Sequence, residues 1–289
     1  MSSSTSAVAP LPAPVSLFGV DFTSAPTRRK PITVARGELN GGALRLLELS
    51  TLGDFTAFEA ALAPGGWPQP WVAGFDLPFG LPRELVLALG WPTQWPALIR
   101  HYARLDRSAI RDRFAAFCDA RPAGSKFAHR ATDGPAGSSP SMKWVNPPVA
   151  WMLHAGAPRL LEAGVHLPGL HEGDPARVAL EAYPGVLARE LIGSRSYKSD
   201  DRARQTPERL IARKDLIEAL EQGRTRLGLR VRLSHAQRDD LVADASGDRL
   251  DALLCLVQTA HAVGRPGYGL PGEGREVDPL EGWIIGLDA

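Results

Sequence analysis

The stretch that decides the fold runs from residue 17 to residue 76 and holds four strand-like apolar segments: LFGVD (17–21), ITVARG (32–37), ALRLLEL (43–49) and WVAGFD (71–76). Pro31 and the turn signal Asn40-Gly41-Gly42 separate the first three segments. Such short connections are typical of antiparallel neighbouring strands. Asp54 is expected to cap a helix over residues 55–63, which leads to the fourth segment. Because a helical crossover permits parallel pairing, we expect the fourth strand to lie parallel to the first.

The rest of the chain is mainly helical in pattern. We expect helices through most of residues 82–165 and over 185–192, 207–222 and 247–263, a further strand at 177–185, and a short edge strand in the closing EGWIIGLD. The sequence therefore predicts an α/β fold with a mixed five-stranded sheet, three antiparallel strands and then parallel strands, flanked by helices. A single domain is expected over residues 17–289, with a helical insertion at about 82–175 and a disordered tail at 1–16.

Composition excludes several classes of protein. The chain has 289 residues, 44% of them hydrophobic and 22% charged, which is typical of a soluble globular protein. Its two cysteines, Cys118 and Cys255, indicate a reducing compartment rather than a disulfide framework. Prolines interrupt the uncharged N-terminal segment, so it does not resemble a secretory signal, and no apolar run reaches the roughly 18 residues that span a bilayer. We therefore expect a cytoplasmic protein without a membrane partner.

Familiar motifs for nucleotide binding, for a hydrolase nucleophile and for metal binding are missing from the sequence. GYGLPG (267–272) has the spacing of a dinucleotide fingerprint, but it follows a predicted helix and contains Pro271, so we interpret it as a loop. The sequence has neither a Walker A motif nor a G-x-S-x-G motif, and its seven histidines show no H-x-x-x-H spacing.

Three strand-like segments end in an acidic residue. The first ends at Asp21, the fourth at Asp76, and the run RVALE at Glu181, and turn or helix-start residues follow each acid. Ligands of open α/β sheets collect just beyond the carboxyl ends of parallel strands. The three acids are therefore expected to face one crevice.

A predicted C-terminal helix adds two more acids, in the segment GDRLDALLCLVQTAHA (247–262). Every residue from Leu250 to Val257 except Asp251 is apolar, which predicts a buried helix. A buried carboxylate is costly unless it is paired or binds a metal. Asp248 lies three residues earlier, on the same face. Clustered carboxylates repel one another, and a bound divalent cation offsets this repulsion. Their hard oxygen atoms suit Mg²⁺ or Mn²⁺ rather than zinc.

Each acid also has an ordinary structural explanation. Asp21 or Asp76 could cap a turn, and Asp248 could complement a helix dipole. Glu181 could pair with Arg177 or Arg189. The coincidence of all five acids is what favours a metal site, with the carboxylates of Asp21, Asp76 and Asp251 within about 4–8 Å of one another and Glu181 at the rim.

The order of elements, with an acid on the first and on the fourth strand, resembles the ribonuclease H-like superfamily, and the segment 247–261 is similar to the final catalytic helix of Holliday-junction resolvases. A closer resemblance, over about residues 17–286, is to the family catalogued as domain of unknown function 429, described as predicted nucleases. Its motifs here are GVDFTSAP, GFDLPFGLP, LEAYPGVLARELIG, the DALL segment and the closing EGWI.

The resemblance implies a nuclease or phosphodiesterase that hydrolyses phosphodiester bonds with two metal ions. Asp21 matches the strand-one aspartate that bridges both metals, and Asp76 matches the second strand-borne acid. Glu181 matches the acid of an E-x-x-P segment, and Asp251 with Asp248 matches the helix acids. Two features depart from the pattern: Phe22-Thr23-Ser24 stands where resolvases usually have glycine, and five acids exceed the usual four.

A nucleic-acid partner would need basic contacts. The formal net charge is only +1, but residues 189–232 hold twelve Lys and Arg against seven Asp and Glu. Arg195 and Lys198 are our candidates for phosphate contacts, although a solvated helix face would explain the same charges. The tryptophans of the insertion would either pack in the core or stack on bases; they are Trp91, Trp95, Trp144 and Trp151.

Two other functions compete with the nuclease. Actin-like sugar kinases and ATPases share the ribonuclease H-like fold, but they need Gly-rich phosphate loops in two duplicated halves, and this sequence has neither. A non-catalytic nucleic-acid or nucleotide-binding protein could retain the fold and use its acids for structure. The sequence leaves open whether the substrate is DNA, RNA or a small phosphodiester, and it does not indicate an oligomeric state.

Overall fold

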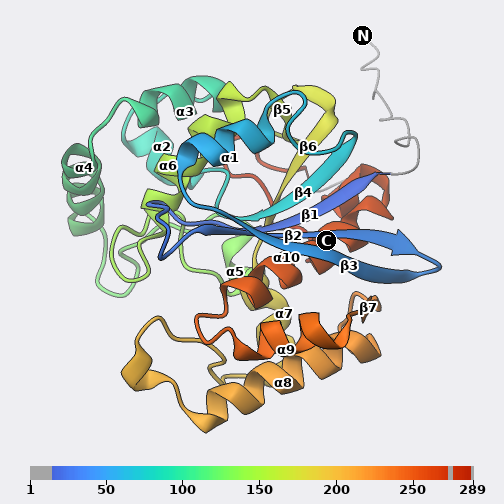
Figure 1. The fold of residues 1–289 in the computed structure, drawn as a ribbon. Helices are drawn as coiled ribbons and strands as arrows, with labels where there is room; N and C mark the ends of the chain where they lie inside the picture. The colour runs from blue at the N-terminus through green and yellow to red at the C-terminus, as the bar shows by residue number, and fades with distance from the viewer. Residues whose placement is uncertain (1–14, 273–275, 288–289) are drawn as a thin grey trace.

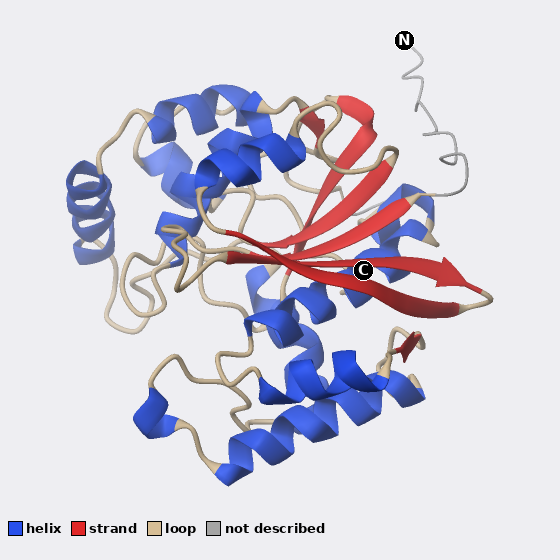
Figure 2. Cartoon of the chain, in the orientation of Figure 1, coloured by secondary structure: helices blue, strands red, loops and turns tan. Residues whose placement is uncertain are grey.

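The computed structural model describes residues 15–272 and 276–287, and it has a mixed seven-stranded sheet with helices on both faces (Figures 1 and 2). The strand order is β5-β6-β4-β1-β2-β3-β7. The strands are β1 (Ser16–Asp21), β2 (Ile32–Asn40), β3 (Ala43–Leu52), β4 (Trp71–Asp76), β5 (Val165–His166), β6 (Asp174–Ala182) and β7 (Arg230–Arg232). Strands β1, β2 and β3 pair antiparallel, whereas β4 is parallel to both β1 and β6, as predicted.

The expected five strands form the middle of this sheet, and two very short strands extend its edges. Strand β5 pairs with β6 and strand β7 pairs with β3, both in parallel. Over its described residues 281–287, the closing EGWIIGLD does not form the edge strand that we predicted. It makes a single bridge from Ile284 to Glu181, because Gly282 and Gly286 take φ angles of 72° and 75°, outside the extended range. Of the expected tail at 1–16, residues 1–14 lie outside the described part, and Ser16 already begins β1.

Helices cover the two faces of the sheet in separate groups. One group covers the face with Phe18 and Phe75: α1 (Phe55–Leu62), α2 (Arg83–Ala88), α3 (Trp95–Ala103), α4 (Arg107–Asp119) and α6 (Val149–Glu162). The other covers the face with Leu17 and Val72: α7 (Pro184–Ile192), α8 (Pro207–Gln222), α9 (His235–Ala243) and α10 (Asp248–Val263). The remaining elements are α5 (Asp133–Ala136), η1 (Arg202–Arg204) and η2 (Pro266–Gly269).

The predicted insertion at about 82–175 contains α2 to α6 and β5. Trp91 and Trp95 are buried in the core there, and the Trp95 indole donates to the carbonyl oxygen of Phe79 at 2.7 Å. Trp144 and Trp151 pack against the same core and are partly buried. None of the helices within the described residues is long and apolar enough to cross a membrane.

Helix α10 lies directly on the middle of the sheet because glycines let it approach. A Cβ atom on Gly19 of β1 would lie 2.1 Å from the backbone nitrogen of Leu256, and one on Gly74 of β4 would lie 2.3 Å from the Thr259 hydroxyl. Such distances leave no room for a side chain. Close contact at these two glycines therefore places the middle of α10 against the sheet, with its first turn toward the ends of β1 and β4.

We expect Gly19→Ala to destabilise the protein by roughly 1–3 kcal/mol or more, because α10 must move away from β1 to admit the methyl group. The measurement is the free energy of unfolding in urea. Gly53→Ala is the matched control, since a Cβ there meets nothing within 4 Å. Equal stability of the two variants would show that α10 does not sit this close to the sheet.

Candidate functional site

Two of the predicted acids end adjacent parallel strands at the same level. Asp21 of β1 and Asp76 of β4 are register partners, and adjacent strands lie about 4.8 Å apart. Side chains alternate along a strand, so Asp21 and Asp76 point to the same face as Gly19 and Gly74. That face is the one on which α10 packs. Both acids are therefore directed toward the first turn of α10.

Helix α10 brings Asp248 and Asp251 to this edge of the sheet. Asp251 is completely buried, and its carboxylate accepts hydrogen bonds from the Tyr197 hydroxyl and the Lys198 ammonium group. Asp248 accepts a hydrogen bond of 2.9 Å from Lys30 Nζ, which also donates to Asp200 at 2.7 Å. The structure thus brings together Asp21, Asp76, Asp248 and Asp251, which we call the carboxylate cluster.

The pKa values of three members of the carboxylate cluster are raised: those of Asp21, Asp76 and Asp251. Burial raises the pKa of Asp21 well above its ordinary value, and the nearby charges of Asp251, Asp248 and Asp76 raise it further. Burial, followed by the charge of Asp251, raises the pKa of Asp76 to about 7, although Lys198 opposes this shift. Burial also raises the pKa of Asp251, with Lys198 and Tyr197 acting in the opposite direction. The cluster therefore resists carrying its full negative charge.

Lys198 supplies the compensating charge. Burial alone would lower the pKa of its ammonium group, but the neighbouring Asp251, Tyr197 and Asp21 outweigh that effect and raise the pKa well above its ordinary value. Within residues 15–272 and 276–287, no three Asp, Glu, His or Cys side chains are already arranged as a set of metal ligands. Lys198 pairs with Asp251 and Lys30 pairs with Asp248, which offsets part of the negative charge of the cluster.

Glu181 has different hydrogen-bond partners from the other predicted acids, although it lines one cavity together with Asp76. Its Cα pairs with Phe75, one residue before Asp76, so its side chain points to the opposite face of the sheet. There it forms a bidentate ion pair with Arg130, with distances of 2.7 and 2.8 Å, and accepts a hydrogen bond of 2.9 Å from Phe79 N. Burial raises the pKa of Glu181, and Arg130 opposes the shift. Arg130, not Arg177 or Arg189, is its partner.

Arg130 joins several distant segments and was not anticipated from the sequence. Its guanidinium also bonds Asp133 at 2.9 Å and the carbonyl oxygen of Glu281 at 3.0 Å. The Glu281 carboxylate in turn accepts from the backbone nitrogens of Arg83 and Ala131 at 2.8 and 2.7 Å. This buried network connects the insertion, the end of β6 and the C-terminal segment.

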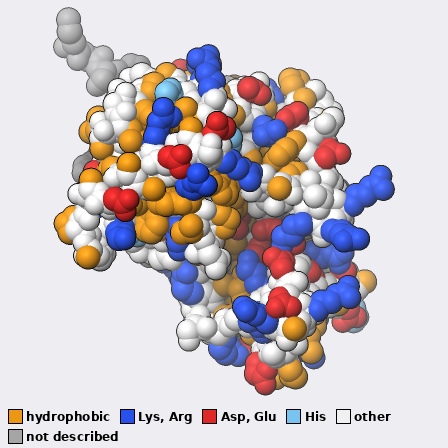
Figure 3. All heavy atoms as spheres, turned by 90° about the vertical axis from the view of Figure 1, so that its left-hand side faces the viewer, with side chains coloured by type: hydrophobic (Ala, Val, Ile, Leu, Met, Phe, Trp, Pro, Cys, Tyr) orange, Lys and Arg blue, Asp and Glu red, His pale blue; other side chains and the backbone are white. Residues whose placement is uncertain are grey.

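The two candidate phosphate contacts lie beside the carboxylate cluster. Arg195 pairs with Asp215 at 2.6 Å while half-exposed, and Lys198 pairs with Asp251. Both line a cavity of about 210 Å³ that also contains Asp76, Tyr183 and Arg189. Figure 3 shows acidic side chains gathered in a hollow of the surface, with Lys and Arg side chains around it. Contact of Arg195 and Lys198 with phosphate remains a prediction.

Comparison of the chain with protein-family models, curated proteins and solved structures finds no match. The chemistry of the carboxylate cluster is therefore the main guide to function. Carboxylates are ligands of divalent cations and basic side chains attract anions, and this sheet edge has both kinds of group: the carboxylate cluster, with Lys30, Arg195 and Lys198 beside it.

Proposed function

We propose that this protein is a divalent-metal-dependent nuclease or phosphodiesterase of the ribonuclease H-like kind, and that Asp21, Asp76 and Asp251, with Asp248, hold Mg²⁺ or Mn²⁺. One observation carries the proposal: Asp21 and Asp76 end neighbouring parallel strands and face the buried Asp251. Three carboxylates held close together repel one another, which lowers the stability of the fold. A bound cation would offset this repulsion, so the arrangement is easier to explain by a metal site than by a structural role. The order of strands and acids, similar to the ribonuclease H-like superfamily, supports the same function.

The donor set fits a hard divalent cation. All four candidate ligands are carboxylates, which Mg²⁺ and Mn²⁺ prefer, and the raised pKa values of Asp21, Asp76 and Asp251 indicate that these three lack sufficient positive charge. Bound ions would activate a water molecule and stabilise the leaving oxygen of a phosphodiester. In this proposal Asp21, Asp76 and Asp251 orient the ions, and Lys198 leaves Asp251 to donate to a phosphate oxygen. Arg195 holds a neighbouring phosphate, and Glu181 supports β6 through Arg130.

We expect millimolar Mn²⁺ to raise the Tm, and to raise it more at about pH 8 than at about pH 6. The pKa of Asp76 is about 7 in the folded chain, above its ordinary value of 3.8. A raised carboxyl pKa stabilises the metal-free fold at low pH, and this contribution is lost as the pH rises from about 4 through 7. Metal replaces the lost protons, so its effect grows over the same pH range.

Asp76→Asn is the matched variant, because it retains the shape of the side chain without its titration. We expect it to lose most of the Mn²⁺ response and the associated pH dependence. If the wild-type Tm were the same in Mn²⁺ and in a chelator at both pH values, the metal site would be wrong. If metal bound but no DNA, RNA, hybrid or small phosphodiester were cleaved, the protein would instead be a non-catalytic nucleic-acid or nucleotide-binding protein.

A further inference from the structure

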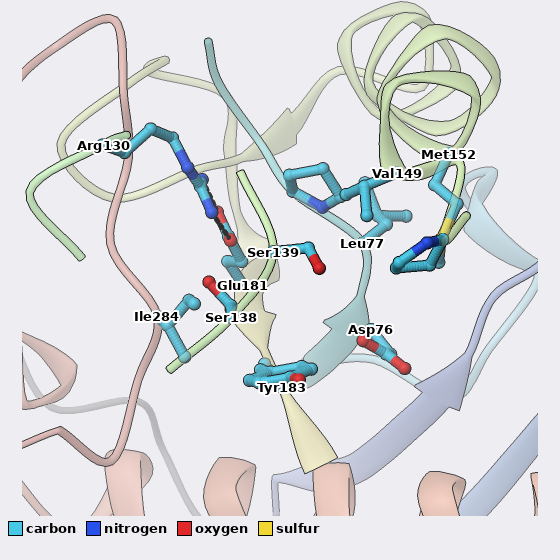
Figure 4. Close-up of a pocket in the computed structure, with 13 residues that line it drawn as sticks. Asp76, Leu77, Arg130, Ser138, Ser139, Val149, Met152, Glu181, Tyr183 and Ile284 are labelled. Atoms are coloured by element: carbon cyan, nitrogen blue, oxygen red, sulfur yellow. Dashed lines mark hydrogen bonds and ion pairs between the residues drawn. The ribbon is translucent and has the colours of Figure 1, made fainter. Parts of the chain in front are cut away.

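Two cavities meet at Asp76 and Tyr183, and both residues line each of them. The basic cavity, of about 210 Å³, is the one lined by Arg189, Arg195 and Lys198. The second, which we call the apolar cavity, has a volume of about 240 Å³ and lies on the insertion side of Asp76. Its walls include Leu77, Val149, Met152 and Ile284 (Figure 4). A ligand that reaches both cavities would lie against Asp76 and Tyr183, which the two cavities share.

The apolar cavity does not suit an anion. Arg130 is the basic residue of its lining, and its guanidinium is already engaged by Glu181, Asp133 and the carbonyl oxygen of Glu281. Glu181 is paired with Arg130, and Asp76 is the remaining carboxyl group of the lining, so no positive charge in the lining is left for an anion. An occupant of this cavity is therefore neutral, whereas the basic cavity attracts an anion.

The shape and lining of the apolar cavity suit a planar heterocycle. The Arg189 guanidinium lies 5.3 Å from the centre of the Tyr183 ring and donates to its hydroxyl at 3.4 Å, which orients the ring. Figure 4 shows Tyr183 beneath Ser138 and Ser139, with Asp76 beside it and Val149 and Met152 across the cavity. Tyr183 offers a stacking surface. The Ser138 hydroxyl donates to Asp133 at 3.1 Å, so it can only accept from the edge of a ring, and the Ser139 hydroxyl is a second candidate hydrogen-bonding group. The volume is below the roughly 300 Å³ at which ligand pockets usually begin, so the cavity has room for a single ring system rather than a larger ligand.

We propose that the apolar cavity binds an unpaired nucleobase, while the adjoining phosphate lies in the basic cavity and the phosphodiester lies over Asp76. This proposal rests on the proposed function and gives it a substrate class: nucleic acid with an unpaired nucleotide at the site. A base that remains stacked and paired in a duplex cannot enter a cavity closed on several sides. The neutral, planar base and the anionic phosphate of one nucleotide match the two cavities in charge and in order.

The test compares the binding of two short fluorescent strands of equal length, one of thymidine nucleotides and one of abasic deoxyribose phosphate. The affinity for each strand is measured by fluorescence anisotropy in the presence of Ca²⁺. The same measurement with a strand of uridine ribonucleotides distinguishes binding of DNA from binding of RNA. We expect wild-type protein to bind the base-bearing strands roughly tenfold more tightly than the abasic strand. Val149→Trp, which fills the apolar cavity, should remove this preference without changing abasic binding. Val145→Trp is the matched control, since Val145 is 49% exposed and does not line the cavity.

A second pair of variants keeps the test decisive if Val149→Trp fails to fold. Tyr183→Leu should lose most of the preference for the base, and Tyr183→Phe should keep it. Equal binding of base-bearing and abasic strands by wild type, or no binding of any strand, would overturn the nucleobase proposal. Metal-dependent cleavage with equal binding would leave the proposed function standing, whereas a base preference without any Mn²⁺ effect on Tm or cleavage would refute only the metal-dependent function.

Discussion

Asp21→Asn is expected to lower Mn²⁺-dependent cleavage of nucleic acid by roughly 100-fold or more. Asp21 ends β1 beside Asp76 and near Asp251, and its loss removes one of the carboxylates that would hold the ions in the proposed function. The fold should not suffer. Burial raises the pKa of Asp21 well above its ordinary value, so a neutral amide relieves repulsion, and the metal-free variant should melt at or above the wild-type temperature.

The measurement is a rate of strand cleavage with DNA, RNA and hybrid substrates, together with the Tm in a chelator. Asp112→Asn is the matched control, because Asp112 lies exposed on α4 and pairs only with its neighbour Arg111 among the ion pairs found in the described residues. Wild-type cleavage rates in Asp21→Asn would remove Asp21 from the mechanism. A large loss of stability in Asp21→Asn would instead show that the Asp21 carboxylate is ionised and paired with positive charge in the metal-free fold.

Much of the site could be predicted because its signals are local. An apolar run that stops at an acid places Asp21 and Asp76 at strand ends, and both strands have their predicted C-terminal residues. A helix that is apolar on all sides apart from one acid predicts that Asp251 is buried, and it is. Short turns and one helical crossover then determine which of these strands are neighbours.

The position of Glu181 shows how a shift of one residue changes the outcome. Strand β6 continues through Ala182, so Ala182 pairs with Asp76, and Glu181 pairs with Phe75. Because side chains alternate along a strand, that single step turns Glu181 to the opposite face. The helix start at Tyr183-Pro184 is the better signal for the end of this strand, because it predicts that the strand ends at Ala182.

Other parts of the structure leave no local trace in the sequence. Lys198 and Lys30 contact their aspartates on α10 from segments 53 and 218 residues away, and a single sequence does not contain such pairings. Strands β5 and β7 have two and three residues, too few for an alternating pattern to be recognised. They form because the neighbouring strand offers free backbone groups.

Arg130→Met is expected to destabilise the protein by about 3–5 kcal/mol, because it leaves Glu181 and Asp133 buried without their shared cation. The side chain of Arg130 is 2% exposed, so water cannot replace its five donors. The free energy of unfolding in urea measures the loss. Adding Glu181→Gln to Arg130→Met should recover part of the stability, since it removes one of the two uncompensated charges.

Glu181→Gln alone then separates a structural role from a metal-binding role. Its carboxylate lies on the face of the sheet opposite to Asp21 and Asp76, so we expect this variant to keep the full increase in Tm with Mn²⁺. Asp76→Asn, measured beside it, should lose that increase. If Glu181→Gln abolished the Mn²⁺ response while its metal-free stability stayed near wild type, Glu181 would be a ligand. Arg130 would then have to release it, as Lys198 must release Asp251, before metal could bind.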